Sequence, residues 1–143
     1  MLYFSKLGSP PSKPLSVYKN KPFARFARKA RISDADLWRA ACLANDGAID
    51  ADLGGGVIKQ RITRAGQGKS GGSRSIVLFK KDGRAVYVFG FEKKDLANIR
   101  KDELEAFREL ANVILGYNEA EMNQRVRDGA LIAVRAPEEE DDD

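Results

Sequence analysis

The chain of 143 residues contains no histidine and a single cysteine, Cys42. Without histidine it lacks the side chain that most often moves protons near neutral pH, and therefore the base of a serine triad. One cysteine excludes a disulfide within the chain and, in the absence of histidine, argues against a zinc site. We therefore expect no metal, no cofactor and activity that survives chelation. The low cysteine content is typical of the reducing cytoplasm.

Long apolar runs are also absent. No run approaches about 18 residues, the length that a membrane-spanning helix needs. The first eight residues hold too short an apolar stretch for a signal peptide. We expect no membrane partner and a cytoplasmic location.

Acidic residues are scarce except at the end of the chain, where residues 138–143 are six consecutive acids. They hide the basic character of the rest, because the whole chain has a net charge of +4 while the chain without them has 25 basic and 15 acidic residues. The length predicts one domain. We expect a proline-rich flexible leader over residues 1–16, a single domain over 17–136 and an acidic disordered tail over 137–143.

The segment from Gly54 to Lys94 is the most informative part of the sequence. Its alternation and turn residues predict three consecutive strands, at Val57–Arg64, Ser73–Lys80 and Arg84–Phe91. A glycine-rich loop, Gly66–Gly72, should be exposed and mobile, and Asp82-Gly83 is typical of a hairpin turn. The third strand is apolar on both sides, with Tyr87, Phe89 and Phe91 on one face, so we expect it to be central.

Helices are predicted on either side of this segment. Pro22 is typical of a first helical turn, and Ser33 with Asp36 forms a capping-box pattern for a second helix. A third helix is expected over Asp102–Leu115, and a short fourth one after Asn118. Three shorter segments complete the interpretation: Leu15–Lys19 as a short strand, Ala48–Gly56 as a connector, and Leu131–Val134 as an edge strand or packed tail. Within the second helix we expect the inward-facing stripe to consist of Leu37, Ala41 and Ala44.

The fold class that follows is α+β. We expect a small antiparallel sheet whose one face packs on the two N-terminal helices, with a C-terminal helix after it. Its other face should carry the basic side chains, since Lys59 and Arg61 alternate with Ile58, Gln60 and Ile62.

The charge of the three-strand segment predicts a polyanionic partner. Gly54–Lys94 holds ten Lys or Arg residues and two acidic ones, a net charge of +8. Lys69-Ser70 among glycines is not a Walker motif, because the required glycine is missing at Thr63 and a strand follows. Guanidinium groups can hold a phosphate and aromatic rings can stack unpaired bases, which fits RNA binding or cleavage at a ribose 2′-OH. Two alternatives remain open. One is that Arg61 and Arg74 only pair with surface acids, and the other is that Tyr87 and Phe91 only belong to the core.

Several strings resemble the RelE/ParE superfamily of bacterial toxins, closest to a HigB-like subgroup. They are GGGVIKQRI, GQGKSGGSR and VFGFEKKDLANI, followed by the helix DELEAFRELA, and the resemblance covers about residues 21–134. It implies a RelE-like fold and a toxin of a type II toxin–antitoxin pair. The resemblance implies a partner antitoxin of the helix-turn-helix type, and mRNA with the ribosome as target. RelE-like members cut mRNA without a metal ion, whereas ParE-like members poison DNA gyrase.

Candidate site residues follow from this resemblance and from the basic face. The catalytic candidates are Arg61, Lys69, Arg74 and Lys93, and the RNA-binding candidates are Lys59, Arg64, Gln67, Lys80, Tyr87, Phe91 and Lys94. The sequence departs from well-known mRNA-cleaving toxins in having no histidine, and Glu92 and Lys93 follow Phe91 where those toxins carry an aromatic residue. The identity of a general base is therefore open. A gyrase poison without nuclease activity and a non-catalytic nucleic-acid-binding module are the alternative functions.

Overall fold

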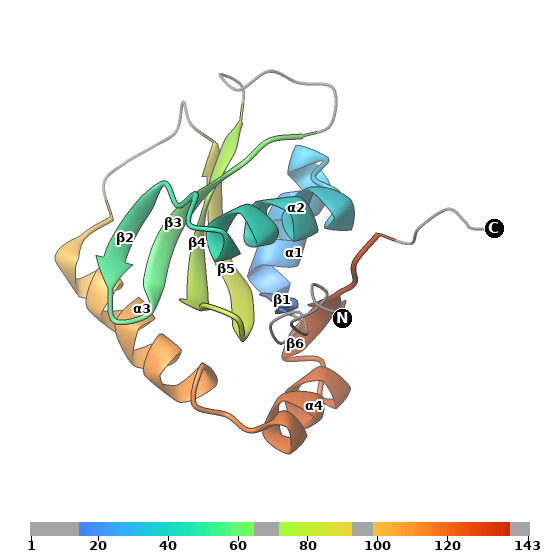
Figure 1. Ribbon diagram of the computed structural model, residues 1–143, viewed down its shortest axis with the longest axis vertical. Helices are drawn as coiled ribbons and strands as arrows, with labels where there is room; N and C mark the ends of the chain where they lie inside the picture. Colours follow the sequence, from blue (N-terminus) through green and yellow to red (C-terminus); the bar gives the residue numbers. More distant parts are fainter. Residues whose placement is uncertain (1–14, 65–71, 93–98, 138–143) are drawn as a thin grey trace, which may run out of the picture.

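The computed structural model of the protein describes residues 15–64, 72–92 and 99–137, which form a six-stranded sheet and four helices (Figure 1). In chain order the elements are β1 (Ser16–Asn20), α1 (Lys21–Ala30), α2 (Asp34–Asn45), β2 (Ala51–Gly54), β3 (Val57–Ile62), β4 (Ser73–Lys80), β5 (Arg84–Glu92), α3 (Lys101–Ile114), α4 (Glu119–Arg127) and β6 (Leu131–Val134). The predicted α+β class is confirmed.

The strands lie side by side in the order β2-β3-β4-β5-β1-β6. β5 is central, as predicted, and β6 pairs with β1 as an edge strand rather than a packed tail. Neighbouring strands are antiparallel except for β1 and β5, which run parallel. The parallel pair is the one departure from the wholly antiparallel sheet that we expected.

Side-chain caps explain where the helices begin. Asn20 accepts a hydrogen bond from the Phe23 N–H at 2.9 Å and so caps α1, and Pro22 lies in the first turn of this helix, as predicted. The predicted capping box of α2 is present: the Asp36 N–H donates to Ser33 Oγ at 3.1 Å and the Ser33 N–H donates to Asp36 Oδ2 at 3.0 Å. Asn118 starts α4 in the same way. These bonds satisfy N–H groups that have no partner inside a helix.

The sheet has a hydrophobic core on each face. α1 and α2 pack on one face through Phe23, Ala27, Leu37 and Ala41, which confirms the predicted place of the two N-terminal helices. On the other face α3 packs against the sheet. Ala111 and Ile114 of α3 belong to the same core as Val57, Leu78 and Val86 of the sheet. Because Val57 and Leu78 lie near the β4–β5 hairpin, α3 covers mainly that half of the face.

Residues 48–56, expected to be a connector, contain strand β2. Ala51 pairs with Lys59 and Gly54 with Val57, and Gly55 and Gly56 turn the chain with φ of 64° and 84°. The expectation of a connector was wrong because three glycines in a row here form a tight turn between strands rather than a linker. In the described part of the chain β2 pairs with β3 no further than Lys59, so the rest of β3 lies at the edge of the sheet.

A bulge in β5 changes which aromatic side chains share a face. Val77 pairs with Tyr87 and Ile76 with Phe89, which leaves one extra residue in β5. The Tyr87 ring consequently lies against α1, 5.0 Å from the Phe23 ring. The Phe89 ring lies on the α3 side, 6.2 Å from the Phe107 ring. The prediction that Tyr87, Phe89 and Phe91 share one face was wrong because strict alternation does not pass through a bulge.

The same bulge turns Gly90 toward α1, where a side chain has no room. A Cβ at this position would overlap the ring of Phe26. We expect Gly90→Ala to lower the free energy of unfolding by about 1–3 kcal/mol, since the ring and the helix that carries it must shift. Denaturant unfolding measures this change.

Gly83→Ala is the matched control, because its Cβ would have no neighbour closer than 3.4 Å. Adding Phe26→Leu to Gly90→Ala should restore part of the lost stability. Equal stability of the two alanine variants would show that the Phe26 ring does not pack on Gly90.

Candidate nucleic-acid interface

The described residues cover the sheet face that carries α3 only in part near the end of β3, the start of β4 and the end of β5. The pairing register places Arg61 of β3 opposite Arg74 of β4, and Arg74 opposite Phe91 of β5. In the neighbouring row Lys59 lies opposite Ile76 and Ile76 opposite Phe89. We call the group Lys59, Arg61, Arg74, Phe89 and Phe91 the open face. It joins cations from two strands with two aromatic rings from a third.

Arg61 and Arg74 are the most prominent pair on the open face. Like charges directly opposite each other on neighbouring strands repel, so the pair favours an anion between them. Arg61 has no ion pair or hydrogen bond with any residue in the described ranges. Arg74 is largely buried, with 11% of its side chain exposed, and its Nη1 lies 3.5 Å from the Gly72 carbonyl oxygen. A guanidinium held in place beside one that has no partner among the described residues suits a phosphate, which both can bind with two N–H groups.

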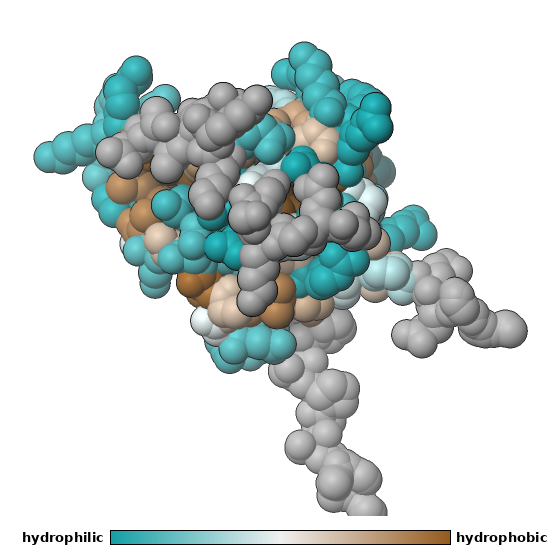
Figure 2. All heavy atoms as spheres, turned by 90° about the horizontal axis from the view of Figure 1, so that it is seen from above, coloured by the Kyte–Doolittle hydropathy of each residue, from teal (hydrophilic) through white to brown (hydrophobic). Residues whose placement is uncertain are grey.

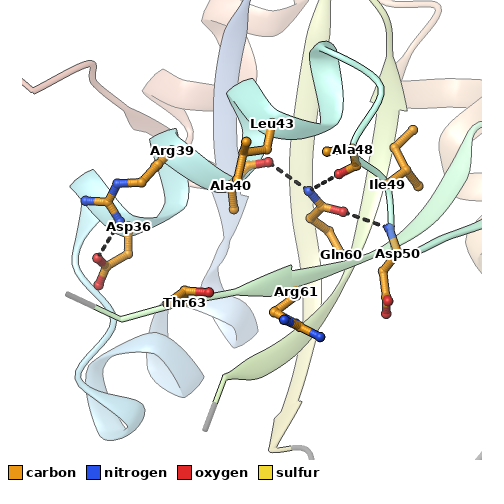
Figure 3. Close-up of a pocket in the computed structure, with 10 residues that line it drawn as sticks. All are labelled: Asp36, Arg39, Ala40, Leu43, Ala48, Ile49, Asp50, Gln60, Arg61 and Thr63. Atoms are coloured by element: carbon orange, nitrogen blue, oxygen red, sulfur yellow. Dashed lines mark hydrogen bonds and ion pairs between the residues drawn. The ribbon is translucent and has the colours of Figure 1, made fainter. Parts of the chain in front are cut away.

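Asp50, which sequence reasoning did not select, contacts the open face. Its Oδ2 lies 3.6 Å from Arg74 Nε and 4.0 Å from Lys59 Nζ. In Figure 3 its side chain and that of Arg61 extend to the same side of β3, away from α2. Three cations against one carboxylate leave the described part of the open face positively charged. Asp50 precedes β2, and the expected connector gave no reason to place it beside Arg74.

Phe89 is a second residue that sequence reasoning left out of the site. It is 46% exposed although it is large and apolar, and its ring centroid lies 6.0 Å from that of Phe91. Phe91, an RNA-binding candidate, is half-buried beside it. An exposed ring near two arginines on neighbouring strands can stack an unpaired base. Strand alternation already placed Phe89 on the same face as Phe91, so the sequence held the signal that could have selected it.

Tyr87 does not belong to the open face. It is 0% exposed, and its hydroxyl donates a hydrogen bond of 2.7 Å to the Leu37 carbonyl oxygen in the core under α2. Burial, with a smaller contribution from Cys42, raises the pKa of Tyr87 far above its usual range. The ring therefore offers no surface to a base and the hydroxyl no proton at neutral pH, which corrects its assignment to RNA binding.

Two further RNA-binding candidates lie away from the open face. Arg64 donates from Nη1 to the Ala30 carbonyl oxygen at 2.9 Å and to Ser73 Oγ at 3.2 Å, so it ties the end of α1 to the sheet. Lys80 is exposed at the other end of β4, six residues and about 20 Å from Arg74. The structure does not bring either of them together with Arg61 and Arg74.

The remaining candidates, Gln67, Lys69, Lys93 and Lys94, lie outside the described residues, as does most of the Gly66–Gly72 loop. Their assignment stays a prediction. β3 ends at Ile62, β4 begins at Ser73 and β5 ends at Glu92, so the chain leaves and re-enters the sheet beside the open face at these points.

A groove of about 350 Å³ adjoins the open face between α2 and β3 (Figure 3). Leu43 and Ile49 give it an apolar wall, and Leu43 is 49% exposed. Arg61 and Asp50 line it as well, so it is continuous with the open face. Figure 2, which looks down on this end of the molecule, shows hydrophilic and apolar side chains next to each other. This mixture suits a ligand with both charged and apolar parts, such as a nucleotide.

Comparison with protein families identifies the family of the chain. A family profile described as the RelE toxin of the RelE / RelB toxin-antitoxin system matches residues 15–134. A search of curated proteins gave no match. No helix in the described ranges has the length and apolar character needed to cross a membrane. Because the family profile covers most of the chain, the protein belongs to the RelE toxin family and is a toxin of a toxin–antitoxin system.

Proposed function

We propose that this toxin inhibits translation by cutting mRNA on the ribosome, without a metal ion. The observation that carries the proposal is the juxtaposition of Arg61 and Arg74 on the open face. Lys59, Arg61 and Arg74 outnumber the one carboxylate beside them, that of Asp50, so RNA can supply a further anion, and its unpaired bases suit the exposed ring of Phe89. Double-stranded DNA would give the ring no unpaired base to stack.

The proposed chemistry relies on position and charge. With the scissile phosphate between Arg61 and Arg74, the guanidinium groups stabilise the extra negative charge that phosphorus acquires when it is attacked. The attacking group is the neighbouring ribose 2′-OH, and stacking on Phe89 fixes the orientation of the chain. Arginine keeps its proton at every relevant pH, so these two residues bind and stabilise but transfer no proton.

A toxin of this family requires a partner that silences it, and we propose a cognate antitoxin of the helix-turn-helix type. The positive open face favours an acidic segment of that partner, which would compete directly with RNA. Membership of the HigB-like subgroup and a cytoplasmic location, where ribosomes are found, are part of the same proposal.

Induced expression in a bacterial host, followed by primer extension on an abundant mRNA, tests the proposal. We expect new 5′ ends within translated regions soon after induction, and no DNA breaks. Growth should stop within the same period.

Two other results would each contradict mRNA cleavage. Intact mRNA together with gyrase-dependent DNA breaks would make the protein a gyrase poison. Intact mRNA and intact DNA, with nucleic acid bound to the purified protein, would make it a binding module. Purified protein on programmed ribosomes, tested beside a gyrase supercoiling assay, separates these outcomes without the cellular response to arrest.

A further inference from the structure

The geometry points to Asp50 as the general base that activates the ribose 2′-OH, an assignment that rests on the proposed function. Asp50 is the carboxylate that contacts Arg74, at 3.6 Å, in the described part of the open face. A phosphate held by Arg74 would bring its neighbouring ribose within reach of this carboxylate. General bases must lie within hydrogen-bond reach of the proton they remove, and the contact with Arg74 puts the Asp50 carboxylate beside the place where the phosphate would bind.

Gln60 fixes the position of Asp50. This buried amide is 3% exposed, and its Nε2 donates to the carbonyl oxygens of Ala40 at 3.0 Å and Ala48 at 2.9 Å. Its Oε1 accepts a hydrogen bond of 3.1 Å from the Asp50 N–H (Figure 3). The Gln60 side chain thus joins three parts of the chain: β3, which carries it, helix α2, and the segment that precedes β2. The backbone of Asp50 is held rigidly although its carboxylate is accessible, which is the arrangement that a preorganised base requires.

Other titratable groups near the open face are engaged elsewhere. Tyr87 is buried, and Glu92 accepts a hydrogen bond from Ser73 Oγ at 3.0 Å and pairs with Arg64 at 3.7 Å. The charged groups that face Asp50 are Lys59 of β3 and Arg74 of β4, with Arg61 alongside. In a chain without histidine, this carboxylate supplies the proton acceptor that the arginines cannot supply.

The step is a transesterification. The Asp50 carboxylate takes the proton of the 2′-OH while the 2′ oxygen forms a bond to phosphorus. The bond between phosphorus and the 5′ oxygen of the next nucleotide breaks, and that oxygen takes a proton from water. The products are a 2′,3′-cyclic phosphate and a 5′-hydroxyl, and Asp50 returns its proton to solvent. No oxidant, reductant or further reactant is needed.

Cleavage of mRNA on programmed ribosomes by Asp50→Asn tests the assignment, measured under single-turnover conditions from acid to neutral pH. We expect a rate about 10²- to 10⁴-fold below that of the unaltered protein. The rate of the unaltered protein should depend on pH, and the rate of Asp50→Asn should not. Ribosome binding and thermal unfolding should be unchanged. Asp46→Asn, at the exposed C-terminal cap of α2, is the matched control.

Asp50→Gly supplies a second test, because added formate should restore part of its activity by taking the place of the carboxylate. If Asp50 only held Arg74 in place, Asp50→Asn would lower the rate equally at every pH and formate would restore nothing. That result, or a rate within about threefold of the unaltered protein, far less than a general base contributes, would overturn the assignment while leaving mRNA cleavage standing. If the unaltered protein leaves ribosome-bound mRNA intact, the proposed function fails and the assignment fails with it.

Discussion

Replacing Arg61 or Arg74 with alanine is expected to lower the rate of mRNA cleavage by about 10²- to 10³-fold, the usual effect of removing one group that stabilises charge in a transition state. The two residues lie opposite each other on β3 and β4. Each substitution therefore removes one of the two guanidinium groups proposed to hold the phosphate. Arg→Lys should also cause a large loss, because an ammonium group cannot bind two phosphate oxygens as a guanidinium does. Single-turnover cleavage on programmed ribosomes measures both effects.

Lys80→Ala is the matched control for these variants. Lys80 carries the same charge on the same sheet but lies exposed at the far end of β4. If loss of any positive charge weakens the toxin, Lys80→Ala will behave like Arg61→Ala. Full cleavage activity and full toxicity in both arginine variants would show that the open face is not the site.

The second large effect concerns stability rather than activity. Arg84→Met is expected to lower the free energy of unfolding by about 2–4 kcal/mol, since charged hydrogen bonds in buried surroundings are strong and their loss leaves acceptors unpaired. Arg84 is buried, and its Nη1 donates to the carbonyl oxygens of Ile114 at 2.7 Å and Tyr117 at 3.0 Å. These bonds fix the C-terminal end of α3 on the sheet. Chemical denaturation measures the change.

Methionine keeps most of the length of the arginine side chain, so the loss reports on the hydrogen bonds more than on packing. Lys80→Met on the paired position of β4 is the control, because Lys80 is exposed. Similar stability of the two methionine variants would contradict the role assigned to Arg84. RNA cleavage by folded Arg84→Met should remain near normal, because Arg84 lies at the hairpin end of the sheet, away from Arg61 and Arg74.

The parts of the fold that local patterns determine were predictable. The capping box of Ser33 and Asp36 marked the start of α2, and the apolar character of both faces of β5 placed that strand at the centre. β2 was missed because four residues with an exposed aspartate show too little alternation to identify a strand. The parallel pairing of β1 with β5 joins residues far apart in the chain, which no local pattern specifies.

The site was predictable to the extent that it follows the strand period. Alternation along β3 placed Lys59 and Arg61 on one face, and the pairing of β3 with β4 places Arg74, also a candidate from the sequence, opposite Arg61. Tyr87 was misplaced because one extra residue in β5 puts it on the face opposite to Phe89 and Phe91. Asp50 was not predicted as a site residue because its contact with Arg74 depends on the turn into β2 and on the buried amide of Gln60.

The central claim, that RNA is cut on the open face, is tested most directly by end-group analysis of ribosome-bound mRNA after a single turnover with purified protein. The account predicts fragments that end in a 2′,3′-cyclic phosphate and begin with a 5′-hydroxyl. It also predicts that the double variant Arg61→Ala, Arg74→Ala produces none of them while remaining folded. Undiminished cleavage by the double variant, or intact mRNA with the unaltered protein while gyrase is inhibited, would contradict it.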